Sequence, residues 1–369
     1  MLSLKKLSLK FRLIISIGVV TALVLTTVTV IVGLKTRSVS RIQATSATKN
    51  LVESSAEKVK VQVGRALESA RVVSRAISGI RAEDSAFSRA SAVEMLKEIL
   101  RGNDQLLGVW TCWEPDAFDG ADSQASEAFW NSEKGRFVPY AYRDGGQIAV
   151  MALNDYQQSD YYTKAKNAGR EAVLEPFQYE IEGKQVLMTT LAVPIKINGR
   201  ILGVAGVDLS LDAFNQMVSQ MDLIGGGNLT VISQGNKFIG HPDAAMAGSR
   251  VSEAHSWFGQ FVSKISSGQG FTTVNRSDQF EGQALRVAVP FEIGSSGSKW
   301  TAMATLPMDA ILAQANEILR LIIIIGGIGF ISVMALLYLL SNSIANPILR
   351  IVQGLNGSSK QVASASSQL

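Results

Sequence analysis

The sequence has little of the chemistry that catalysis and metal binding need. Its 369 residues include one cysteine, Cys112, and two histidines, His241 and His255. One cysteine excludes an intrachain disulfide, and its neighbours Trp110 and Trp113 indicate a small buried hydrophobic residue, not a reactive thiol. The histidines have no cysteine or acidic cluster nearby, so they support neither a metal site nor a Ser-His-Asp arrangement. We therefore expect no enzymatic activity, no cofactor and no metal.

Clusters of basic side chains are also missing. The 35 lysine and arginine residues only slightly exceed the 31 aspartate and glutamate residues, and they are spread through the chain. No stretch interleaves them with aromatic residues, as a surface that binds nucleic acid would require. Nucleic acid is therefore not an expected partner.

Charge is absent from two long segments. Leu13–Leu34 contains no charged residue, and Leu321–Leu340 is an uncharged run rich in Ile, Leu and Gly. Each supplies the roughly 20 apolar residues that cross a bilayer as a helix. We predict transmembrane helices at 13–34 and 321–340, with membrane lipid as their surroundings.

A secretory signal peptide is the alternative for the first run, because four basic residues precede it: Lys5, Lys6, Lys10 and Arg12. The apolar region of a signal peptide is usually about 7–15 residues long and ends at a small-residue cleavage site. This run is longer and continues into a helical pattern, which favours an uncleaved helix.

The two predicted spans separate a long central segment from two short ends. The charge bias across the first span is weak, because basic residues flank it on both sides. A segment as long as 35–320 translocates largely regardless of charge. We predict that 35–320 is periplasmic or extracellular, that 1–12 and 341–369 are cytoplasmic, and that the protein lies in the inner (plasma) membrane.

A heptad-like apolar seam follows the first predicted span. Its members recur at alternating spacings of four and three residues: Val52, Ala56, Val59, Val63, Ala66, Ala70, Val73, Ile77 and Ile80. Such a seam predicts a long helix over 38–81 that packs along a partner. The partner is either the symmetry mate in a homodimer or the body of the helix's own domain. We predict that the protein works as a homodimer.

Short apolar runs separated by turn residues begin at about residue 104 and are typical of strands. The runs are Leu106–Trp113, Phe137–Tyr142, Ile148–Leu153, Val186–Ile197 and Ile201–Leu209. Asn198-Gly199 and Asp144-Gly145-Gly146 lie between such runs and predict hairpin turns. We therefore expect an antiparallel sheet in a membrane-distal unit at about 82–215.

A second, shorter group of strands repeats this rhythm. Its runs are Leu229–Ser233, Lys237–Gly240, Gly270–Val274, Leu285–Phe291 and Trp300–Thr305. They predict a membrane-proximal unit at about 220–307, in which His241-Pro242 marks a surface turn. The expected fold is α+β, with a long N-terminal helix followed by two tandem antiparallel-sheet units between two transmembrane helices.

Five segments recur in a fixed order along the predicted exported region: Trp113–Gly120, Gly135–Tyr140, Asp160–Tyr162, Glu175–Phe177 and Gly203–Asp208. In this order they resemble the double Cache sensor domain of methyl-accepting chemotaxis proteins, over most of 37–310. Each segment alone is unspecific, but the ordered set between two spans is specific. The resemblance implies two PAS-like units and a small-molecule ligand in the membrane-distal one.

The segment after the second predicted span carries the same resemblance. Asn346-Pro347-Ile348 resembles the opening of the cytoplasmic coupling helix of these receptors, and Val352–Leu369 resembles the start of a methyl-accepting signalling helix. A full coupling module would continue through a connector into a second helix, which this sequence does not include. The resemblance implies a chemoreceptor whose partners are a cytoplasmic chemotaxis kinase and its adaptor.

Two other outputs stay open, because sensor modules are shared among receptor classes. The same sensor could control a histidine kinase or a nucleotide cyclase, or it could belong to a membrane-anchored solute-capture protein without signalling. The sequence after Pro347 contains no histidine-kinase or cyclase motif and favours the chemoreceptor.

The resemblance also bears on the ligand. In amino-acid-binding relatives it implies an arginine two positions before an aromatic pair, which holds the ligand carboxylate, and an aspartate on a later strand, which holds the ammonium. Here the pair is Tyr161-Tyr162, the arginine position is Ser159, and the aspartate is Asp208. The missing guanidinium disfavours an α-amino acid, and a carboxylate among aromatic rings favours a cation.

The candidate ligand-binding residues are therefore aromatic and acidic side chains of the predicted distal unit: Trp110, Trp113, Tyr140, Tyr142, Asp160, Tyr161, Tyr162 and Asp208. An amine is the favoured ligand, and a flat nitrogen-rich ring such as a purine, or a carboxylate, is the alternative. In the competing interpretation the strand aromatics fill a core and Asp208 caps the next helix.

Overall fold

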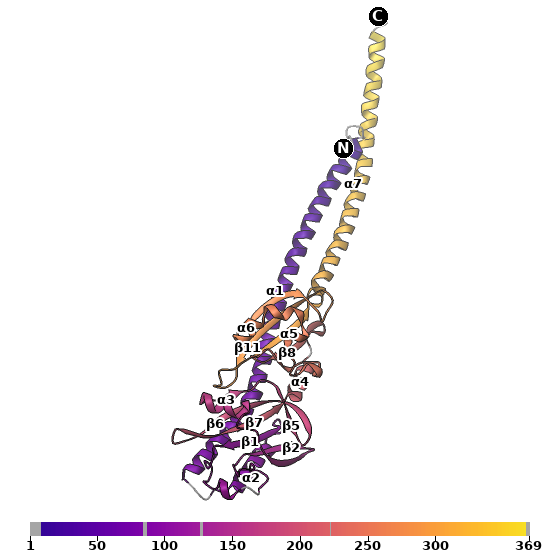
Figure 1. The fold of residues 1–369 in the computed structure, drawn as a ribbon. Coiled ribbons are helices and arrows are strands. Elements are labelled where there is room, and N and C mark those ends of the chain that lie inside the picture. Colours follow the sequence, from indigo (N-terminus) through magenta and orange to yellow (C-terminus); the bar gives the residue numbers. More distant parts are fainter. Residues whose placement is uncertain (1–8, 84–86, 126–127, 222, 367–369) are drawn as a thin grey trace. The chain divides into compact units, whose positions relative to one another are not determined.

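A computed structural model describes residues 9–83, 87–125, 128–221 and 223–366. It divides into two compact units, of which one comprises the residues up to Gln43 together with those from Ile311, and the other is Ala44–Ala310 (Figure 1). The second unit contains both sheets.

Two helices of the described chain are long and apolar enough to cross a membrane. Helix α1 is Leu9–Glu83 and helix α7 is Met308–Ser366. The predicted spans 13–34 and 321–340 lie inside them, and apolar side chains such as Leu23 and Ile325 are exposed to the surroundings. Helix α1 has no break between the predicted span and the predicted long helix at 38–81.

The first module of the Ala44–Ala310 unit is built around an antiparallel sheet. Its elements are α2 Arg89–Arg101, β1 Gly108–Trp113, η2 Asp122–Gln124, β2 Pro139–Asp144, β3 Gln147–Ala152, α3 Asp160–Ala168, β4 Ala172–Val173, β5 Phe177–Ile181, β6 Lys184–Ile197, β7 Arg200–Ser210 and α4 Leu211–Ser219. Among the described residues, seven strands form this sheet in the order β3-β2-β1-β7-β6-β4, with β5 paired to β6. The long hairpin β6–β7 brings β7 beside β1 at its centre.

The hairpin turns form where the sequence predicts them. Asn198 and Gly199 join β6 to β7 with positive φ angles of 50° and 78°. Gly145 and Gly146 join β2 to β3 with φ angles of 55° and 91°. Two consecutive positive φ angles give the backbone twist that a two-residue hairpin needs, and Asn and Gly adopt them at the lowest cost.

The second module repeats the plan with a smaller sheet. Its elements are η3 Ile224–Gly226, β8 Asn228–Ile232, β9 Phe238–Gly240, η4 Ala244–Met246, α5 Val251–Ala254, η5 Ser256–Gln260, α6 Val262–Ser266, β10 Phe271–Arg276, β11 Gln283–Glu292 and β12 Lys299–Pro307. In the described chain five strands pair in the order β10-β11-β12-β8-β9, all antiparallel. The predicted α+β fold with two tandem antiparallel-sheet modules is therefore confirmed.

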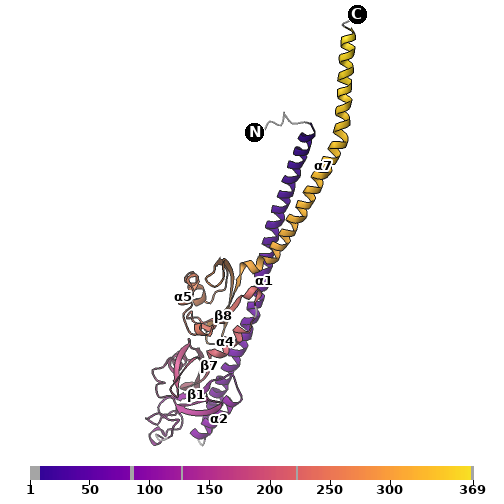
Figure 2. The same cartoon turned by 90° about the vertical axis from the view of Figure 1, so that its right-hand side faces the viewer.

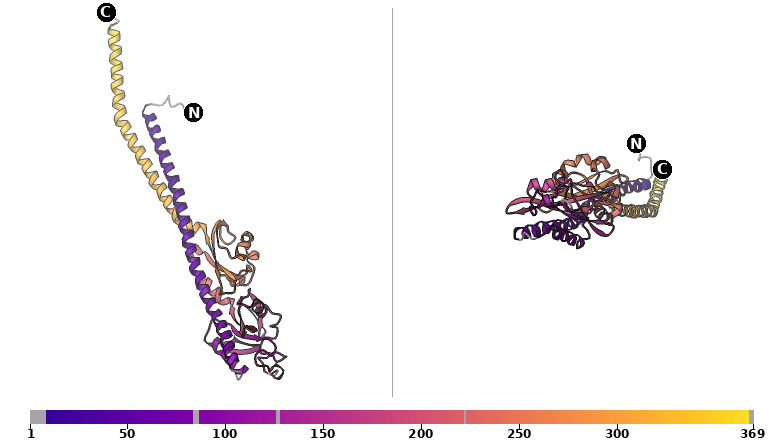
Figure 3. Two further views of the ribbon diagram at one scale, coloured as in Figure 1. Left: turned by 90° about the vertical axis from the view of Figure 1, so that its left-hand side faces the viewer. Right: turned by 60° about the horizontal axis from the view of Figure 1, so that its bottom comes forward.

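The apolar seam of α1 packs within its own chain. Every predicted seam residue from Val52 to Ile77 is buried, and Ser74 donates from Oγ to the carbonyl of Pro194 on β6 (3.0 Å). Figures 2 and 3 show both modules on one side of the α1 segment that belongs to their unit. The seam therefore does not support a homodimer, because its side chains are already buried within their own chain. Dimerisation stays a prediction that does not rest on the seam.

Two further predictions concern single residues. Cys112 is free and fully buried, as its tryptophan neighbours indicate. The prediction of a surface turn at His241 is wrong, because His241 is only 7% exposed. Its ring packs edge-on against Phe238, with 4.8 Å between ring centres, and its Nδ1 accepts a hydrogen bond from the backbone N–H of Asp243 (3.0 Å). The turn is present, but it folds the imidazole inward.

Candidate ligand-binding site

The first module contains a buried carboxylate at the centre of its sheet. Asp208 on β7 is 5% exposed. Its Oδ1 accepts hydrogen bonds from Thr190 Oγ1 (2.5 Å) and, more weakly, from Trp110 Nε1 (3.4 Å). Burial raises the pKa of Asp208 to about 6, because these hydrogen bonds only partly offset the loss of water around the charged form. The carboxylate thus lacks a cationic partner among the groups that contact it.

Glycines on neighbouring strands position the aromatic rings beside this carboxylate. Gly206 pairs with Trp110, and a Cβ at Gly206 would lie 2.1 Å from the indole ring. A Cβ at Gly108 would lie 2.2 Å from the ring of Tyr140. Only glycine lets these rings lie flat on the sheet. The glycines therefore set the aromatic walls that surround Asp208.

Asp208 and these rings enclose a small cavity, which we call the inner cavity. It is lined by Trp110, Tyr140, Leu153, Tyr161, Phe177, Tyr179, Met188, Thr190 and Asp208. Its volume of about 10 Å³ has room for roughly one water molecule. Of these nine side chains only that of Asp208 carries a charge at neutral pH, and the buried Tyr140 hydroxyl is close enough to interact with it.

A larger opening, the outer cleft, adjoins the inner cavity and shares Tyr161, Phe177 and Tyr179 with it. Its volume is about 370 Å³, and it is lined by Asp155, Ser159, Asp160, Tyr161, Lys164, Leu174, Glu175, Pro176, Phe177, Gln178, Tyr179 and Lys237. Asp155 Oδ1 accepts hydrogen bonds from the hydroxyls of Tyr161 (2.8 Å) and Tyr179 (3.4 Å). One carboxylate thus holds two of the three rings that divide the cavity from the cleft.

The structure brings four of the predicted site residues together in the inner cavity, namely Trp110, Tyr140, Tyr161 and Asp208. It places the other four elsewhere. The hydroxyl of Tyr142 donates to Glu182 (2.7 Å), and that of Tyr162 donates to Glu114.

Trp113 and Asp160 also lie outside the inner cavity. Trp113 is three residues from Trp110 on β1, so it points to the opposite face of the sheet, where its ring packs edge-on against Phe118 with 5.1 Å between ring centres. Asp160 lines the outer cleft, with its side chain 69% exposed and paired with Lys164 at 2.9 Å. Neither side chain lines the inner cavity.

Several cavity residues were not predicted: Leu153, Phe177, Tyr179, Met188, Thr190 and, in the cleft, Asp155. Thr190 is opposite Asp208 in the β6–β7 register. A bulge between Ile195 and Lys196 shifts this register by one residue, so counting back from the Asn198-Gly199 turn would have placed Thr189, and not Thr190, opposite Asp208. Phe177 and Tyr179 lie two residues apart, as strand periodicity requires for one face, but β5 is short and was not predicted.

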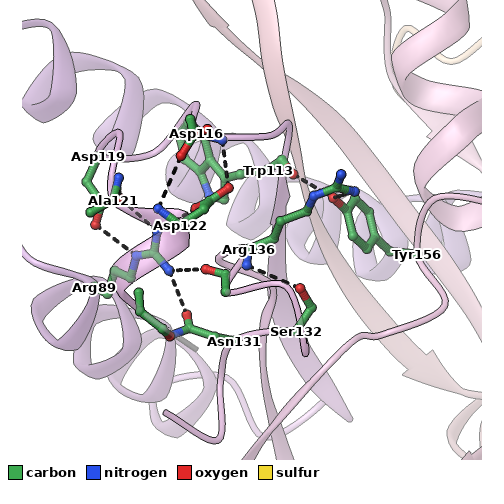
Figure 4. A network of polar contacts seen from close by, with 12 residues as sticks. Arg89, Trp113, Asp116, Asp119, Ala121, Asp122, Asn131, Ser132, Arg136 and Tyr156 are labelled. Atoms are coloured by element: carbon green, nitrogen blue, oxygen red, sulfur yellow. Dashed lines mark hydrogen bonds and ion pairs between the residues drawn. The ribbon is translucent and has the colours of Figure 1, made fainter. Parts of the chain in front are cut away.

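A buried ionic network holds the loop that follows β1 (Figure 4). The guanidinium of Arg89 forms two hydrogen bonds to Asp119 (2.7 and 2.8 Å) and one to Asp122 (2.6 Å), and Nη1 donates to Asn131 (3.0 Å) and to the carbonyl of Gly135 (2.5 Å). Burial alone would lower the pKa of Arg89, but its aspartate partners raise it. The segments 113–120 and 135–140, noted in the sequence, are thus joined through a structural network.

The segment before β5 connects the cavity to the second module. Glu175 accepts hydrogen bonds from the backbone N–H of Gly235 (2.9 Å) and from the Ser233 hydroxyl, and Lys237 Nζ donates to the carbonyl of Pro176 (2.9 Å). Phe177, the next residue, lines the inner cavity. We call Glu175–Phe177 the connecting strap.

Two tandem antiparallel-sheet modules beside a long helix, with a cavity in the first, define a ligand-binding sensor. Residues 93–216 match the family model described as "Methyl-accepting chemotaxis protein-like, first PDC sensor domain". The chain therefore carries a chemotaxis-type sensor, and the double Cache resemblance is confirmed.

Individual relatives agree with this assignment. The chain is 25% identical over 252 residues to the methyl-accepting chemotaxis protein TlpQ of Pseudomonas aeruginosa, a match that covers 63% of this chain and 34% of TlpQ. The chain thus spans about a third of that relative's length. A structure titled "Methyl-accepting Chemotaxis protein X" has a TM-score of 0.65 at 25% identity, covering 72% of this chain and 98% of that one.

One solved structure comes from another receptor class. The extracellular domain of the putative histidine kinase mmHK1S-Z2 has a TM-score of 0.63 at 26% identity, and the match covers 72% of this chain and 98% of that one. The two apolar helices and these extracellular sensor neighbours fit a membrane receptor. The same sensor fold thus occurs in a chemotaxis protein and in a putative histidine kinase.

Proposed function

We propose that this chain is the sensing region of a membrane chemoreceptor and that it binds a small amine with its ammonium group on Asp208. The observation that carries this proposal is a buried carboxylate, surrounded by Trp110, Tyr140, Tyr161 and Tyr179, without a cationic partner. Aromatic faces attract an ammonium, with about 0.5–2 kcal/mol per contact, and a desolvated carboxylate supplies its counter-charge.

The outer cleft disfavours an α-amino acid. Ser159, at the position where the resemblance implies an arginine, lies in the cleft and donates its hydroxyl to Asp155. The two lysines of the cleft are engaged, Lys164 with Asp160 and Lys237 with a backbone carbonyl. A ligand carboxylate would thus find no guanidinium and would face Asp155.

Ligand entry requires the inner cavity to enlarge, because about 10 Å³ does not hold an amine. The outer cleft is large enough for a small metabolite, and Tyr161, Phe177 and Tyr179 form the boundary between the two spaces. Displacement of these rings on binding gives the ligand different affinities for two arrangements of the module, which is the requirement for a signal.

The affinity for the amine is expected to depend on pH. Asp208 with a pKa of about 6 takes up a proton as the pH falls, and the protonated carboxyl cannot pair with an ammonium. Between pH 7.5 and about 6 the affinity should be constant, and below about 6 it should fall roughly tenfold per pH unit. Calorimetry on the full chain in detergent, at pH 7.5, 6 and 5, measures this with a ligand found by screening amines.

The screen includes α-amino acids, purines and carboxylates as competing classes. An amine that binds equally well at pH 7.5 and 5, or tight binding of an α-amino acid with no amine bound, would contradict the proposed site. Binding of a purine that depends on Asp208 would favour the flat-heterocycle alternative.

Residues 35–320 are proposed to be exported, with both ends cytoplasmic. A cysteine in place of Lys134 in the first module should react with a membrane-impermeant maleimide in intact cells, because Lys134 is exposed. The native Cys112 is buried and gives little background. Labelling only after the cells are permeabilised would show the opposite topology.

The output proposed for the whole receptor is control of a cytoplasmic chemotaxis kinase through its adaptor. The sequence after Pro347 resembles a chemoreceptor signalling helix, and α7 continues as one helix through this segment. A histidine kinase output is the second candidate, because a histidine kinase sensor matches this fold as well as a chemotaxis sensor does. Fusing residues 1–369 to a chemoreceptor signalling domain and measuring amine-dependent swimming tests the first output.

A further inference from the structure

The second module contains a buried arginine that is only partly paired. Arg286 on β11 is 0% exposed and lies two residues before Ala288, so both side chains point to the face that carries the apolar core of the module. Its Nη1 donates to Asn275, but its Nε and Nη2 have no hydrogen-bond partner among the described residues. Burial lowers the pKa of Arg286 to about 10, since nearby Asp278 only partly offsets the loss of water.

Hydrogen-bond donors around this arginine converge on one carboxylate. Asp278, in the loop between β10 and β11, accepts a hydrogen bond at Oδ1 from Trp257 Nε1 (3.1 Å), and its Oδ2 lies 3.1 Å from His255 Nδ1. The amide of Gln279 donates to His255 Nε2 (3.1 Å), which assigns the proton of a neutral His255 to Nδ1. Arg286 Nη2 lies 3.8 Å from Asp278 Oδ1, beyond hydrogen-bond distance.

Two aromatic neighbours complete the surroundings of this arginine. The guanidinium of Arg286 lies over the ring of Trp257, 4.0 Å from its centre. His241 Nδ1 lies within hydrogen-bond distance of both the backbone N–H (3.0 Å) and the carbonyl (3.1 Å) of Asp243, and its Nε2 is buried with no partner in the described part of the chain. Its ring centre is 6.4 Å from that of His255. The hydrogen-bond donors of this cluster therefore outnumber the acceptors that lie within hydrogen-bond distance of them.

Each module has a buried charged side chain opposite a buried threonine in a hairpin, but the two charges differ in sign and lie on different strands of their hairpins. In the β6–β7 hairpin the buried Thr190 is opposite Asp208, and in the β11–β12 hairpin the buried Thr305 is opposite Arg286. Each charged side chain lies on the face of its sheet that carries the apolar core cluster. The chemistry that favours a cation in the first module favours an anion in the second.

We propose that Arg286, Trp257 and His255 form a second ligand site, which binds a small monocarboxylate about the size of acetate. The end of the Asp278 side chain is a group of that size, and the loop holds it in front of Trp257 and His255 but too far from Arg286. A free carboxylate that replaces it can approach the guanidinium and accept from Nε and Nη2 together. The loop Ser277–Gly282, whose Asp278 side chain is 32% exposed, is the part that moves aside.

The test uses the full chain in detergent, with sodium acetate as the probe and sodium chloride at equal ionic strength as the reference. Acetate should raise the apparent melting temperature of the parent, because a ligand that binds the native state stabilises it. Arg286→Gln should weaken acetate binding at least tenfold in calorimetry. Asp278→Asn keeps an acceptor for Trp257 but removes the competing charge, so it should bind acetate at least tenfold more tightly than the parent.

Acetate binding by Asp278→Asn tests the proposal even if Arg286→Gln does not fold, because misfolding does not increase binding. Acetate binding that is absent in both the parent and Asp278→Asn, or equal in the parent and Arg286→Gln, would overturn the proposal. Asp208→Asn should leave the acetate response unchanged, and Asp278→Asn should leave amine binding unchanged. Failure at one site is thus distinguishable from failure at the other.

Discussion

Asp208→Asn should abolish tight amine binding while the first module stays folded. The substitution preserves size but removes the charge that pairs with the ammonium. Loss of a buried charge pair commonly costs about 2–5 kcal/mol, which is a factor of roughly thirty or more in affinity. Calorimetry at pH 7.5, with the amine found by screening, measures this ratio against the parent.

The same substitution should not destabilise the protein at neutral pH. A folded-state pKa of about 6, against about 3.8 in the unfolded chain, means that the folded state holds the proton more tightly. Stability from this group is therefore present at low pH and is lost as the pH rises to about 6, a difference on the order of 3 kcal/mol. The lost hydrogen bond from Thr190 offsets part of the expected gain. The apparent melting temperature of Asp208→Asn should equal or exceed that of the parent at pH 7.5, and the difference should shrink by pH 4.5.

Asp212→Asn is the matched control, because Asp212 is exposed on α4, four residues further along the chain. It should bind the amine as the parent does. An Asp208→Asn variant that binds the true ligand with the parent's affinity would remove Asp208 from the site.

Arg89→Ala should cause the largest loss of stability among the changes considered. The substitution leaves Asp119 and Asp122 without the guanidinium that neutralises them, and the Asp122 side chain is only 9% exposed. Breaking a buried ion pair by removing one partner costs about 3–5 kcal/mol. Chemical denaturation of the full chain in detergent, followed by tryptophan fluorescence, measures this difference.

Arg101→Ala provides the comparison on the same helix. Arg101 pairs with Glu98 at the surface, and exposed pairs of this kind contribute only about 0–1 kcal/mol. Equal stabilities of the two variants would mean that the network in Figure 4 does not hold the loop after β1.

The fold could be predicted where local chemistry alone decides it. Asn198-Gly199 and Gly145-Gly146 adopt the positive φ angles that the dipeptides favour, and the apolar runs beside them form the strands. The partner of the α1 seam could not be predicted, because a heptad pattern shows that a face is covered but not by what. The seam is covered by the modules of its own chain.

The candidate site was predicted only in part, because residue types alone do not show which side chains face the same cavity. Asp208, Trp110, Tyr140 and Tyr161 line the inner cavity, whereas Trp113, three residues from Trp110, lies on the other face of β1. Strand alternation would have separated the two tryptophans. Contacts between segments distant in the sequence, such as those of Asp155 with Tyr161 and Tyr179, depend on loop paths that no local pattern encodes.

If the proposed function holds, the connecting strap ties the sensitivity of the receptor to the strength of its output. Phe177 borders the inner cavity, while Glu175 and Pro176 contact the second module through three hydrogen bonds. If binding weakens these contacts by some factor, the contacts weaken binding by the same factor, because coupling between two sites is reciprocal. A stronger attachment between the modules would therefore transmit a larger change per bound molecule. It would also raise the ligand concentration at which the receptor responds. Substitutions at Ser233 and Gly235 could thus shift the detection threshold without altering a residue that lines the inner cavity.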